Sequence, residues 1–395
     1  MSALEGVKVI DVGQFYFGPY CTMLMARLGA EVIKIEAPEG DPYRRLPTVD
    51  GDGSSIQFRF LNAGKRTMRL DLKSSAGQQI LRDLAAQSDV VVQNLSPGAM
   101  DRFGLGYDEL SAVNPRLIMA SGTGFGTSGP YAGEPAMDLT IQARTAVMST
   151  TGFEDGPPTR TGPSFVDFIA ATHLLSGVLA ALYQRTVTGR GQHVEVALQD
   201  AVIPALTSNI AGLLAPGQEI PERTGNRHGG HAVTPYNAFP TADGWITVLC
   251  PTDAHWRRLC ELMNDPATDD ERFADMAGRC KRCEEVDDIV GRWTRRRQKD
   301  ELTEALKAAR IPCAPVVTLP ELLVDPHVKA RQIIREVTDS EGTFTTLGSP
   351  LLLSDSPMVE PARAGGLGEH TDEILREYLG MTSVEIDSLR HNDVI

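Results

Sequence analysis

The sequence predicts an α/β protein with a Rossmann-like large domain and a smaller second α/β domain. Two patterns support this. Short apolar runs typical of buried strands alternate with helical patterns over the first 200 residues, and the pattern then changes to hairpin signals and charged helices. The length, 395 residues, exceeds what one ordinary hydrophobic core covers. We therefore expect at least two domains.

Residues 6–36 predict a strand, a helix and a second strand. GVKVIDV has the composition of a buried strand, and EVIKIE that of another. Between them, Gly18 and Pro19 open a helical pattern with proline in its first turn, and Gly29 ends it. This βαβ pattern is the basis for predicting a parallel sheet.

The same alternation continues along the chain. MRLDL (68–72) predicts a strand, Ser74 or Ser75 caps the next helix, and DVVVQNL (89–95) predicts a buried strand. Short helices around 100–113, the strand LIMASGTGF, a long apolar helix at 168–185 and the strand HVEVAL follow. We expect helices on both faces of a mostly parallel sheet.

The domain boundaries follow from where this pattern stops and returns. We assign 1–200 to the large domain, 201–224 to a linker containing three prolines, and 225–320 to the small domain. In the small domain a hairpin turns at Asp243–Gly244, and helices rich in charge follow. Residues 321–340 form a second predicted linker. Residues 341–395 return to the large domain, so the chain is discontinuous.

Composition restricts the partners and the location. The formal net charge of −14 disfavours nucleic acid or an anionic membrane as the main partner. The chain enters a strand pattern without a secretory signal, and the near-apolar run 168–183 is shorter than the roughly 20 residues of a membrane span. We expect a cytoplasmic protein that binds neither nucleic acid nor membrane.

Two cofactor classes are disfavoured by spacing. Cys280 and Cys283 form the one CxxC pair, without the second ligand pair of a zinc site, so we interpret them as reduced thiols on a helix and expect no metal. The loop GQFYFGP and Glu36 lie where a dinucleotide fold holds its cofactor. Gly13 and Gly18 do not form GxGxxG, however, and aromatic residues fill the loop.

The best candidate for chemistry is Asp167, an acidic residue in an otherwise apolar stretch ahead of a long apolar helix pattern. Such a residue is either the N-cap of the helix or a catalytic carboxylate, and the pattern leaves both open. Among the histidines, His173 is expected in a core. His228 and His231 flank a Gly-Gly pair and are placed to touch a ligand.

Several blocks together resemble one known family. LEGVKVIDVGQFYFGPYCTMLMARLGAEVIKIE, KRTMRLDLKSSAG, VVVQNLSPGAMDRFGL and TGPSFVDFIAATHLLSG occur in order, followed by RTGNRHGGHAVTPYNAFPTADGWI, IPCAPVVTLPELLVDPHVKAR and LGEHTDEIL. They look like the class III CoA-transferases, the family of formyl-CoA transferase and carnitine CoA-transferase. The resemblance covers nearly the whole chain.

The resemblance implies a function and a set of residues. It implies a CoA-transferase with an acyl-CoA donor, a carboxylate acceptor and no metal, in which Asp167 is the nucleophile. It also implies an interlocked homodimer. The residues implied to hold coenzyme A are Leu70, Lys73, Asn94, Leu95, Ser96, Arg102, Phe103, Met137 and Asp138. Those implied to face the substrate are Tyr16, Phe17, His228, Gly229 and Gly230.

The chemistry of these residue types agrees with the resemblance. Lys73 and Arg102 suit the phosphates of coenzyme A, and Phe103 suits its adenine. An aspartate needs no general base to be ionised at neutral pH, so it can attack a thioester directly. Formyl-CoA transferase has a glutamine where this chain has Tyr16. We therefore expect a larger acyl group, dicarboxylic or branched.

Two alternatives remain. An α-methylacyl-CoA racemase shares the fold and exchanges an α-proton by means of a histidine and an aspartate. Here Met137 stands in the place of that histidine, directly before Asp138, and methionine carries no proton. The second alternative is a CoA-binding protein without catalysis, which would have no use for a buried acid at position 167.

Overall fold

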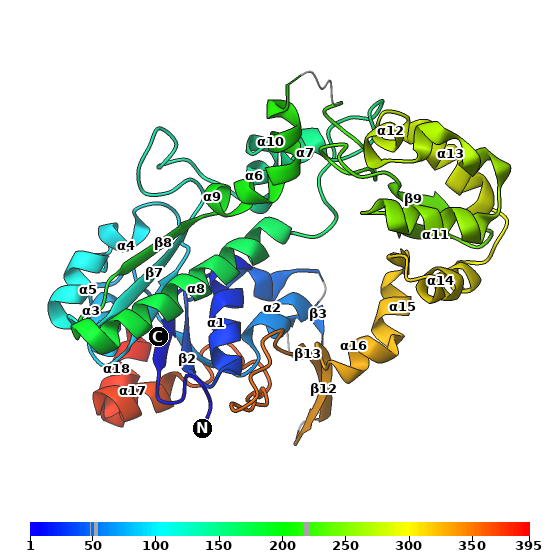
Figure 1. Cartoon of the computed structure of the whole chain (residues 1–395). Helices are drawn as coiled ribbons and strands as arrows, with labels where there is room; N and C mark the ends of the chain where they lie inside the picture. Colours follow the sequence, from blue (N-terminus) through cyan, green and yellow to red (C-terminus); the bar gives the residue numbers. More distant parts are fainter. Residues whose placement is uncertain (48, 51–53, 217–220, 341) are drawn as a thin grey trace. The chain divides into compact units, whose positions relative to one another are not determined.

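The computed structural model describes residues 1–47, 49–50, 54–216, 221–340 and 342–395 (Figure 1). By internal contacts the chain forms two compact units. The large unit consists of residues 1–141, 164–202 and 323–395, and the small unit consists of 142–163 and 203–322.

The large unit contains a six-stranded parallel sheet in the order β5-β2-β1-β6-β7-β8. Its strands are β1 (Lys8–Asp11), β2 (Glu31–Glu36), β5 (Arg66–Arg69), β6 (Val90–Gln93), β7 (Ile118–Thr123) and β8 (His193–Ala197). The middle strands are apolar because both faces are covered, as the fully buried Val90, Val91 and Val92 illustrate. The predicted α/β class and parallel sheet are confirmed.

Helices cover both faces of this sheet. On one face α1 (Phe17–Arg27) and α8 (Phe165–Thr188) pack against each other, and α8 contacts β7 and β8 (Figure 1). On the other face α3 (Ser75–Ala85), α5 (Tyr107–Val113), α17 (Thr371–Leu379) and α18 (Ser383–His391) share one buried cluster with strand residues. The C-terminal Val394 and Ile395 belong to that cluster.

Local signals explain where several of these helices begin and end. The Ser74 hydroxyl accepts from the N–H of Gly77 at 3.0 Å, so of the two predicted caps, Ser74 and Ser75, it is Ser74 that caps α3. At the other end of α8, Gly189 has the left-handed conformation that stops a helix, with φ at 72°. Helix α8 is 24 residues long, more than the near-apolar run predicted.

That length changes one argument from the sequence. Among the described residues α8 is the one helix long and apolar enough to cross a membrane, judged by length and composition alone. The shortness of the apolar run therefore no longer argues against a span. In the structure α8 packs within the large unit, where it contacts α1, α9 (Leu198–Val202), β7 and β8.

Smaller elements complete the large unit. They are η1 (Pro42–Arg45), β3 (Val49–Asp50), β4 (Ser54–Ser55), α2 (Ile56–Asn62), α4 (Ala99–Arg102), α9, α16 (Pro326–Ala330), β12 (Ile334–Asp339) and β13 (Gly342–Leu347). The strand predicted in TFTTLGSPLLL is β13. It pairs antiparallel with β12 in a separate two-stranded sheet and does not join the parallel sheet.

The small unit is built on a three-stranded antiparallel sheet in the order β11-β10-β9. Its strands are β9 (Tyr236–Pro240), β10 (Trp245–Leu249) and β11 (Cys313–Pro315), and the predicted hairpin at Asp243–Gly244 joins the first two. The helices are α7 (Val147–Thr150), η2 (Ile203–Leu206), α10 (Thr207–Leu214), α11 (Asp253–Met263), η3 (Pro266–Asp269), η4 (Glu271–Phe273), α12 (Met276–Cys280), α13 (Cys283–Thr294) and α14 (Lys299–Ala308).

The domain boundaries predicted from the sequence differ from the division into these two compact units, and they remain predictions. The segment 201–224, predicted as a linker, contains α10, and its residues 217–220 lie outside the described part of the chain. The segment 321–340 contains α16 and β12. Two helices, α6 (Asp138–Arg144) and α15 (Leu319–Val324), extend across the boundaries of the units.

Candidate active site

A cavity of about 740 Å³ lies in the large unit, where the loops that follow the strands meet. The loop after β1 contributes Gln14 and Phe15, the loop after β5 contributes residues 70–73, and the loop after β6 contributes residues 94–97. The carboxyl ends of parallel strands are the usual position of ligand sites in open α/β sheets. Its size suits a molecule as large as coenzyme A.

Asp167 lines this cavity from the first turn of α8. Helix α8 begins at Phe165, so Asp167 is its third residue, and the N-cap is Ser164. The interpretation of Asp167 as an N-cap is therefore wrong. The Asp167 carboxyl group is not engaged in capping its own helix and faces the cavity.

The capping function belongs to Asp138. A carboxylate oxygen of Asp138, which is 8% exposed, accepts from the N–H of Val166 at 2.9 Å and from the N–H of Asp167 at 3.4 Å. An acid at a helix N-terminus satisfies N–H groups that lack partners within the helix. Asp138 thus holds the turn that carries Asp167, although the sequence predicted only a contact with coenzyme A.

The setting of Asp167 changes its acidity. Burial, and secondarily the negative charge of Asp138, raise the pKa of Asp167 from its ordinary 3.8 to about 7. No lysine or arginine contributes to this shift among the described residues. Near neutral pH the carboxyl group is therefore divided between its protonated and ionised forms.

Aromatic rings form a wall beside Asp167. Tyr16 packs edge-on against Tyr43 with ring centroids 4.7 Å apart, and its ring is tilted against Phe168 with centroids 5.4 Å apart. Phe15 packs edge-on against Tyr43 at 5.2 Å. Phe15, Tyr43 and Asp167 line the same cavity, and the pKa of Tyr43 is raised mainly by burial, with smaller contributions from Tyr16 and from the charge of Asp167.

Phe17 completes this wall by a close approach to β7. A Cβ atom added at Gly122 would lie 2.6 Å from the Phe17 ring, too close for any larger residue. Glycine at position 122 therefore lets the Phe17 ring reach the end of β7 and face the cavity. The sequence predicted Phe17 at the site but contained no signal for Gly122.

Two cations also line the cavity. Lys73 and Arg102 line it, both side chains are exposed, and neither has an ion-pair partner in the described part of the chain. One Arg102 nitrogen donates to the carbonyl of Pro97 at 3.0 Å. Phe103 lies next to Arg102 in the same cavity. Free cations beside an aromatic ring suit a nucleotide with phosphates.

Asn94 differs from its neighbours. Its side-chain oxygen accepts from the N–H of Gln14 at 2.7 Å, and its side-chain nitrogen donates to the carbonyl of Gln14 at 3.0 Å. Both polar atoms of the amide are therefore engaged with the loop after β1, although the nitrogen has a second N–H.

The structure brings most of the predicted site residues together. Those that line the cavity are Asp167, Phe17, Leu70, Lys73, Asn94, Leu95, Ser96, Arg102, Phe103 and Met137, of which Met137 is 52% exposed. Tyr16 and Asp138 are not among the lining residues. The sequence missed Tyr43, Glu39 and Glu134 as lining residues, since nothing in their spacing marks them.

His228, Gly229 and Gly230 belong to the small unit. A Cβ atom at Gly229 would lie 2.8 Å from the side chain of Asn209, and one at Gly230 would lie 2.7 Å from the Ser208 carbonyl. The two glycines thus allow this loop to pack tightly on α10. Their predicted place in the substrate site stays a prediction.

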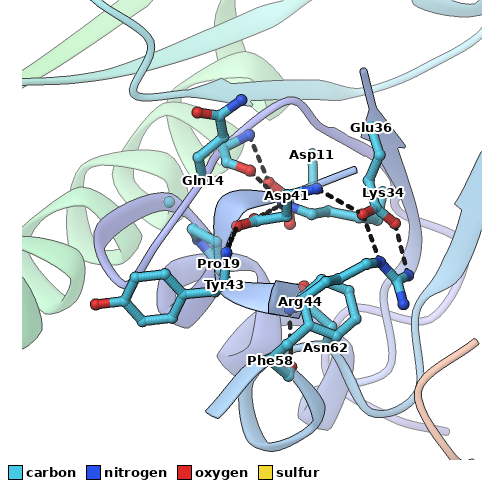
Figure 2. A network of polar contacts seen from close by, with 12 residues as sticks. Asp11, Gln14, Pro19, Lys34, Glu36, Asp41, Tyr43, Arg44, Phe58 and Asn62 are labelled. Carbon is cyan, nitrogen blue, oxygen red and sulfur yellow. Dashed lines mark hydrogen bonds and ion pairs between the residues drawn. The ribbon is translucent and has the colours of Figure 1, made fainter. Parts of the chain in front are cut away.

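Glu36 and the CxxC pair, weighed from the sequence as cofactor ligands, have other surroundings. Glu36, considered for a ribose contact, is buried and held by Arg44 at 2.7 Å, so it is not available to a dinucleotide (Figure 2). Cys280 and Cys283 are free thiols, and burial raises the pKa of each. In the ranges that the structure describes, no three metal-ligating side chains lie together.

Comparison with known sequences identifies similar proteins. The sequence profile of CoA-transferase family III matches residues 4–371. A formyl-CoA:oxalate CoA-transferase of Streptomyces coelicolor is 39% identical over 416 residues, covering 100% of this chain and 99% of the relative. A succinyl-CoA:mesaconate CoA-transferase of Haloarcula marismortui is 36% identical over 389 residues, with 95% and 96% covered.

Comparison with solved structures also finds similar proteins. The crystal structure of a CAIB/BAIF family protein from Brucella suis superposes with a TM-score of 0.84 and 32% sequence identity. The match covers 95% of this chain and 99% of that protein. The chain therefore matches both sets of proteins over nearly their full lengths.

Proposed function

The chain belongs to CoA-transferase family III and is an enzyme of this class, and on this premise we propose that Asp167 is the residue that carries the transfer. One observation carries the proposal. The Asp167 carboxyl group opens into the same cavity as the free cations Lys73 and Arg102, which suit the phosphates of coenzyme A. Thioester and nucleophile can therefore meet in one site.

We place coenzyme A along the ends of the strands. Lys73 and Arg102 hold the phosphates, and Phe103 contacts the adenine. The backbone of residues 70–73 and 94–97 offers N–H and carbonyl groups to the amides of the pantetheine arm. In this orientation the thioester reaches the end of the cavity where Asp167 meets the aromatic rings.

The first half of the reaction forms an anhydride and then a thioester on Asp167. A carboxylate oxygen of Asp167 attacks the carbonyl carbon of the acyl-CoA, the carbon–sulfur bond breaks, and coenzyme A leaves as the thiolate. The thiolate then attacks the aspartyl carbonyl of the anhydride. This releases the donor acid as a carboxylate and leaves coenzyme A bound to Asp167.

The second half repeats these steps in reverse with another acid. The acceptor carboxylate attacks the aspartyl thioester, expels the thiolate and forms a second anhydride. The thiolate attacks the acceptor carbonyl, which gives the new acyl-CoA and restores the Asp167 carboxylate. No step transfers a proton, so no general base is needed.

Both intermediates react readily with water, and the surroundings of Asp167 bear on this. Phe15, Phe17 and Tyr43 give this end of the cavity an apolar wall. An apolar wall limits the number of waters that can reach an acylated Asp167. Burial of Asp167, and secondarily the charge of Asp138, raise the pKa of the free acid. Excluding water therefore protects the intermediates but leaves less of Asp167 in the ionised form that attacks the thioester.

We propose donors and acceptors from the relatives and from the wall. The relatives are named for formyl, oxalate, succinyl, mesaconate and citramalate groups. The aromatic rings at positions 15–17 favour a branched or dicarboxylic acyl group over formyl. Racemase chemistry is disfavoured, because Met137 at the edge of the cavity cannot accept a proton.

The assembly and location are proposals as well. We propose a homodimer of interlocked chains that acts in the cytoplasm on small molecules. Mixing tagged and untagged dimers under native conditions tests the interlocking. We expect no mixed dimers over days, and rapid formation of mixed dimers would contradict it.

A panel assay tests the proposed function. The purified enzyme is incubated with succinyl-CoA, formyl-CoA or a branched acyl-CoA and with oxalate, mesaconate, citramalate or branched acids, and new CoA esters are identified by mass spectrometry. We expect a new ester for at least one pair. Hydrolysis of the donor without any new ester would contradict the proposal.

A further inference from the structure

The loop segment Gly13–Pro19, which is the loop after β1 together with the first three residues of α1, carries two of the rings that line the cavity, Phe15 and Phe17. Phe15 has a positive φ of 61°, a backbone conformation that residues other than glycine rarely adopt. Such a conformation persists only when its surroundings fix it. The contacts of the loop backbone therefore decide where the two rings lie.

Buried side chains take up the polar backbone groups at both ends of the loop. An Asp11 carboxylate oxygen accepts from the N–H of Gly13 at 2.9 Å, and the Lys34 ammonium donates to the Gly13 carbonyl. The Lys65 ammonium donates to the carbonyl of Pro19 at 2.9 Å. Between these ends, the amide of Asn94 holds both backbone groups of Gln14.

The charged side chains among these form one buried network, of which Figure 2 labels Asp11, Lys34 and Asp41. Lys65 pairs with Asp11 at 2.9 Å, and Lys34 pairs with Asp41 at 3.0 Å, with all four side chains 0–1% exposed. Buried ion pairs contribute little net stability compared with apolar side chains of the same size. What this network does supply is a fixed geometry for the backbone that it binds.

Glycines make room for the Asn94 amide. A Cβ atom at Gly13 would lie 3.0 Å from the Asn94 side-chain oxygen, and one at Gly18 would lie 2.8 Å from the same oxygen. A Cβ atom at either glycine would also lie 2.9 Å from the Cα atom of the other. Loop and amide therefore fit in one arrangement, and a larger residue at either position would displace them.

From these contacts we propose that Asn94 and Lys34 are positioning residues that hold the loop Gly13–Pro19 as a fixed wall of the acyl site. They act through the ring of Phe15, which lies against Tyr43 and faces the cavity of Asp167. The inference rests on the proposed function, because the wall selects among acyl groups only if acyl-CoA is the substrate. It assigns Asn94 a function other than contact with coenzyme A.

The first test compares acyl selectivity in Asn94→Ala, Phe15→Ala and the double variant. The readout is the ratio of kcat/KM for two donors, propionyl-CoA and a bulky branched acyl-CoA. We expect each single variant to change this ratio by about 10-fold. If Asn94 acts through Phe15, the double variant changes it no further. Additive effects of the two substitutions would overturn the proposal.

The second test separates positioning from ligand contact. The dissociation constant of free coenzyme A is measured for wild type and for Asn94→Ala, and we expect values within about 2-fold of each other. A large loss of affinity for coenzyme A with unchanged acyl selectivity would assign Asn94 to the ligand instead.

A matched control uses Asn114. Its side-chain nitrogen donates to the carbonyls of Ala85 at 3.0 Å and Ser88 at 2.8 Å, so it holds backbone as Asn94 does but does not line the cavity. Asn114→Ala should leave acyl selectivity within about 2-fold of wild type. An equal change of selectivity in Asn114→Ala would mean that general destabilisation explains both variants.

A readout without turnover keeps the inference separate from the proposed function. Hydrogen exchange is followed on the peptide that contains residues 13–19 in wild type, Asn94→Ala and Lys34→Met. We expect about 10-fold faster exchange in that peptide for each folded variant, and no change in the peptide of α5. If the variants exchange faster but wild type transfers no CoA, the proposed function is contradicted and the positioning of the loop is not. Unchanged exchange in Asn94→Ala would overturn the inference, whether or not Lys34→Met folds.

Discussion

Two aspartates of the large unit, the buried Asp11 and the half-buried Asp167, have opposite surroundings. Asp11 is fully buried among Lys65, Lys34 and Thr22, and although burial acts to raise its pKa, the two lysines hold the pKa below the ordinary value. Asp167 is half-buried beside another acid, and desolvation together with the charge of Asp138 raises its pKa to about 7. The Asp11 carboxylate has two lysines beside it, whereas no cation among the described residues lowers the pKa of Asp167.

The different surroundings suit Asp11 to a structural role and Asp167 to a chemical one. A carboxylate that is paired and hydrogen-bonded is stabilised as an anion and reacts poorly, so Asp11 serves to hold the loop and α1. A carboxylate without a counter-charge is less stable as an anion and more reactive towards an electrophile. Substituting either aspartate, or a residue that surrounds it, therefore tests the comparison.

The largest effect is expected from Asp167→Asn. Loss of the nucleophile should lower CoA transfer by at least about 10³-fold while the affinity for coenzyme A stays near that of wild type. Steady-state kinetics with the best donor and acceptor, together with calorimetric titration of coenzyme A, measure both quantities. A variant that keeps more than a tenth of wild-type turnover would remove Asp167 from the mechanism, by the same order-of-magnitude standard.

Lys65→Met should reduce stability rather than chemistry. It leaves Asp11 buried with one fewer partner, and breaking a buried pair costs about 3–5 kcal/mol. The exposed Lys329 provides the matched control, since Lys329→Met should stay within about 0.5 kcal/mol of wild type. Urea unfolding followed by circular dichroism measures both variants. Equal free energies of unfolding for the two variants would show that the ion pair of Asp11 and Lys65 does not stabilise the fold.

Asp138→Asn should shift the pH dependence of the reaction. The ionised form of Asp167 is the nucleophile, so kcat/KM should fall as pH decreases through about 7 in wild type. Removing the charge of Asp138 lowers the pKa of Asp167, which moves this acidic limb to lower pH. The amide oxygen of asparagine still accepts from the Val166 N–H, and Asp387→Asn on the exposed face of α18 serves as control. An acidic limb that does not move would show that Asp138 does not tune Asp167.

The smallest effect concerns stability against pH. Because the folded-state pKa of Asp167 is raised, the acid favours the folded state at low pH, and that contribution is lost as pH rises from about 4 to about 7. Asn cannot ionise and avoids this loss. We expect a higher Tm for Asp167→Asn than for wild type at pH 8, with a smaller difference at pH 4.5. A lower Tm at pH 8 would mean that the ionised carboxylate has partners outside the described contacts.

Much of the fold followed from local signals in the sequence. Apolar runs such as Val90–Val92 marked the buried strands, Ser74 marked a helix start, and Asp243–Gly244 marked the hairpin. The pairing of β13 with β12 could not be foreseen, because a strand pattern does not specify its partner. The family resemblance found in the sequence is confirmed.

The site was predicted in its composition but not in its geometry. The blocks around Lys73, Asn94 and Asp167 led to one cavity. The sequence did not show that Asp138 caps the turn of Asp167, nor that the Asn94 amide is taken up by Gln14. Both contacts join residues far apart in the chain, so no spacing pattern records them.

Trapping the intermediate tests the central claim, that Asp167 carries the transferred group. The enzyme is incubated with its donor acyl-CoA, quenched with hydroxylamine and digested, and the peptide that contains SFVDFIAA is analysed by mass spectrometry. We predict an aspartyl hydroxamate at Asp167 that requires the donor and is absent in Asp167→Asn. Continued turnover with an unmodified Asp167, or with the hydroxamate on another carboxylate, would contradict the account.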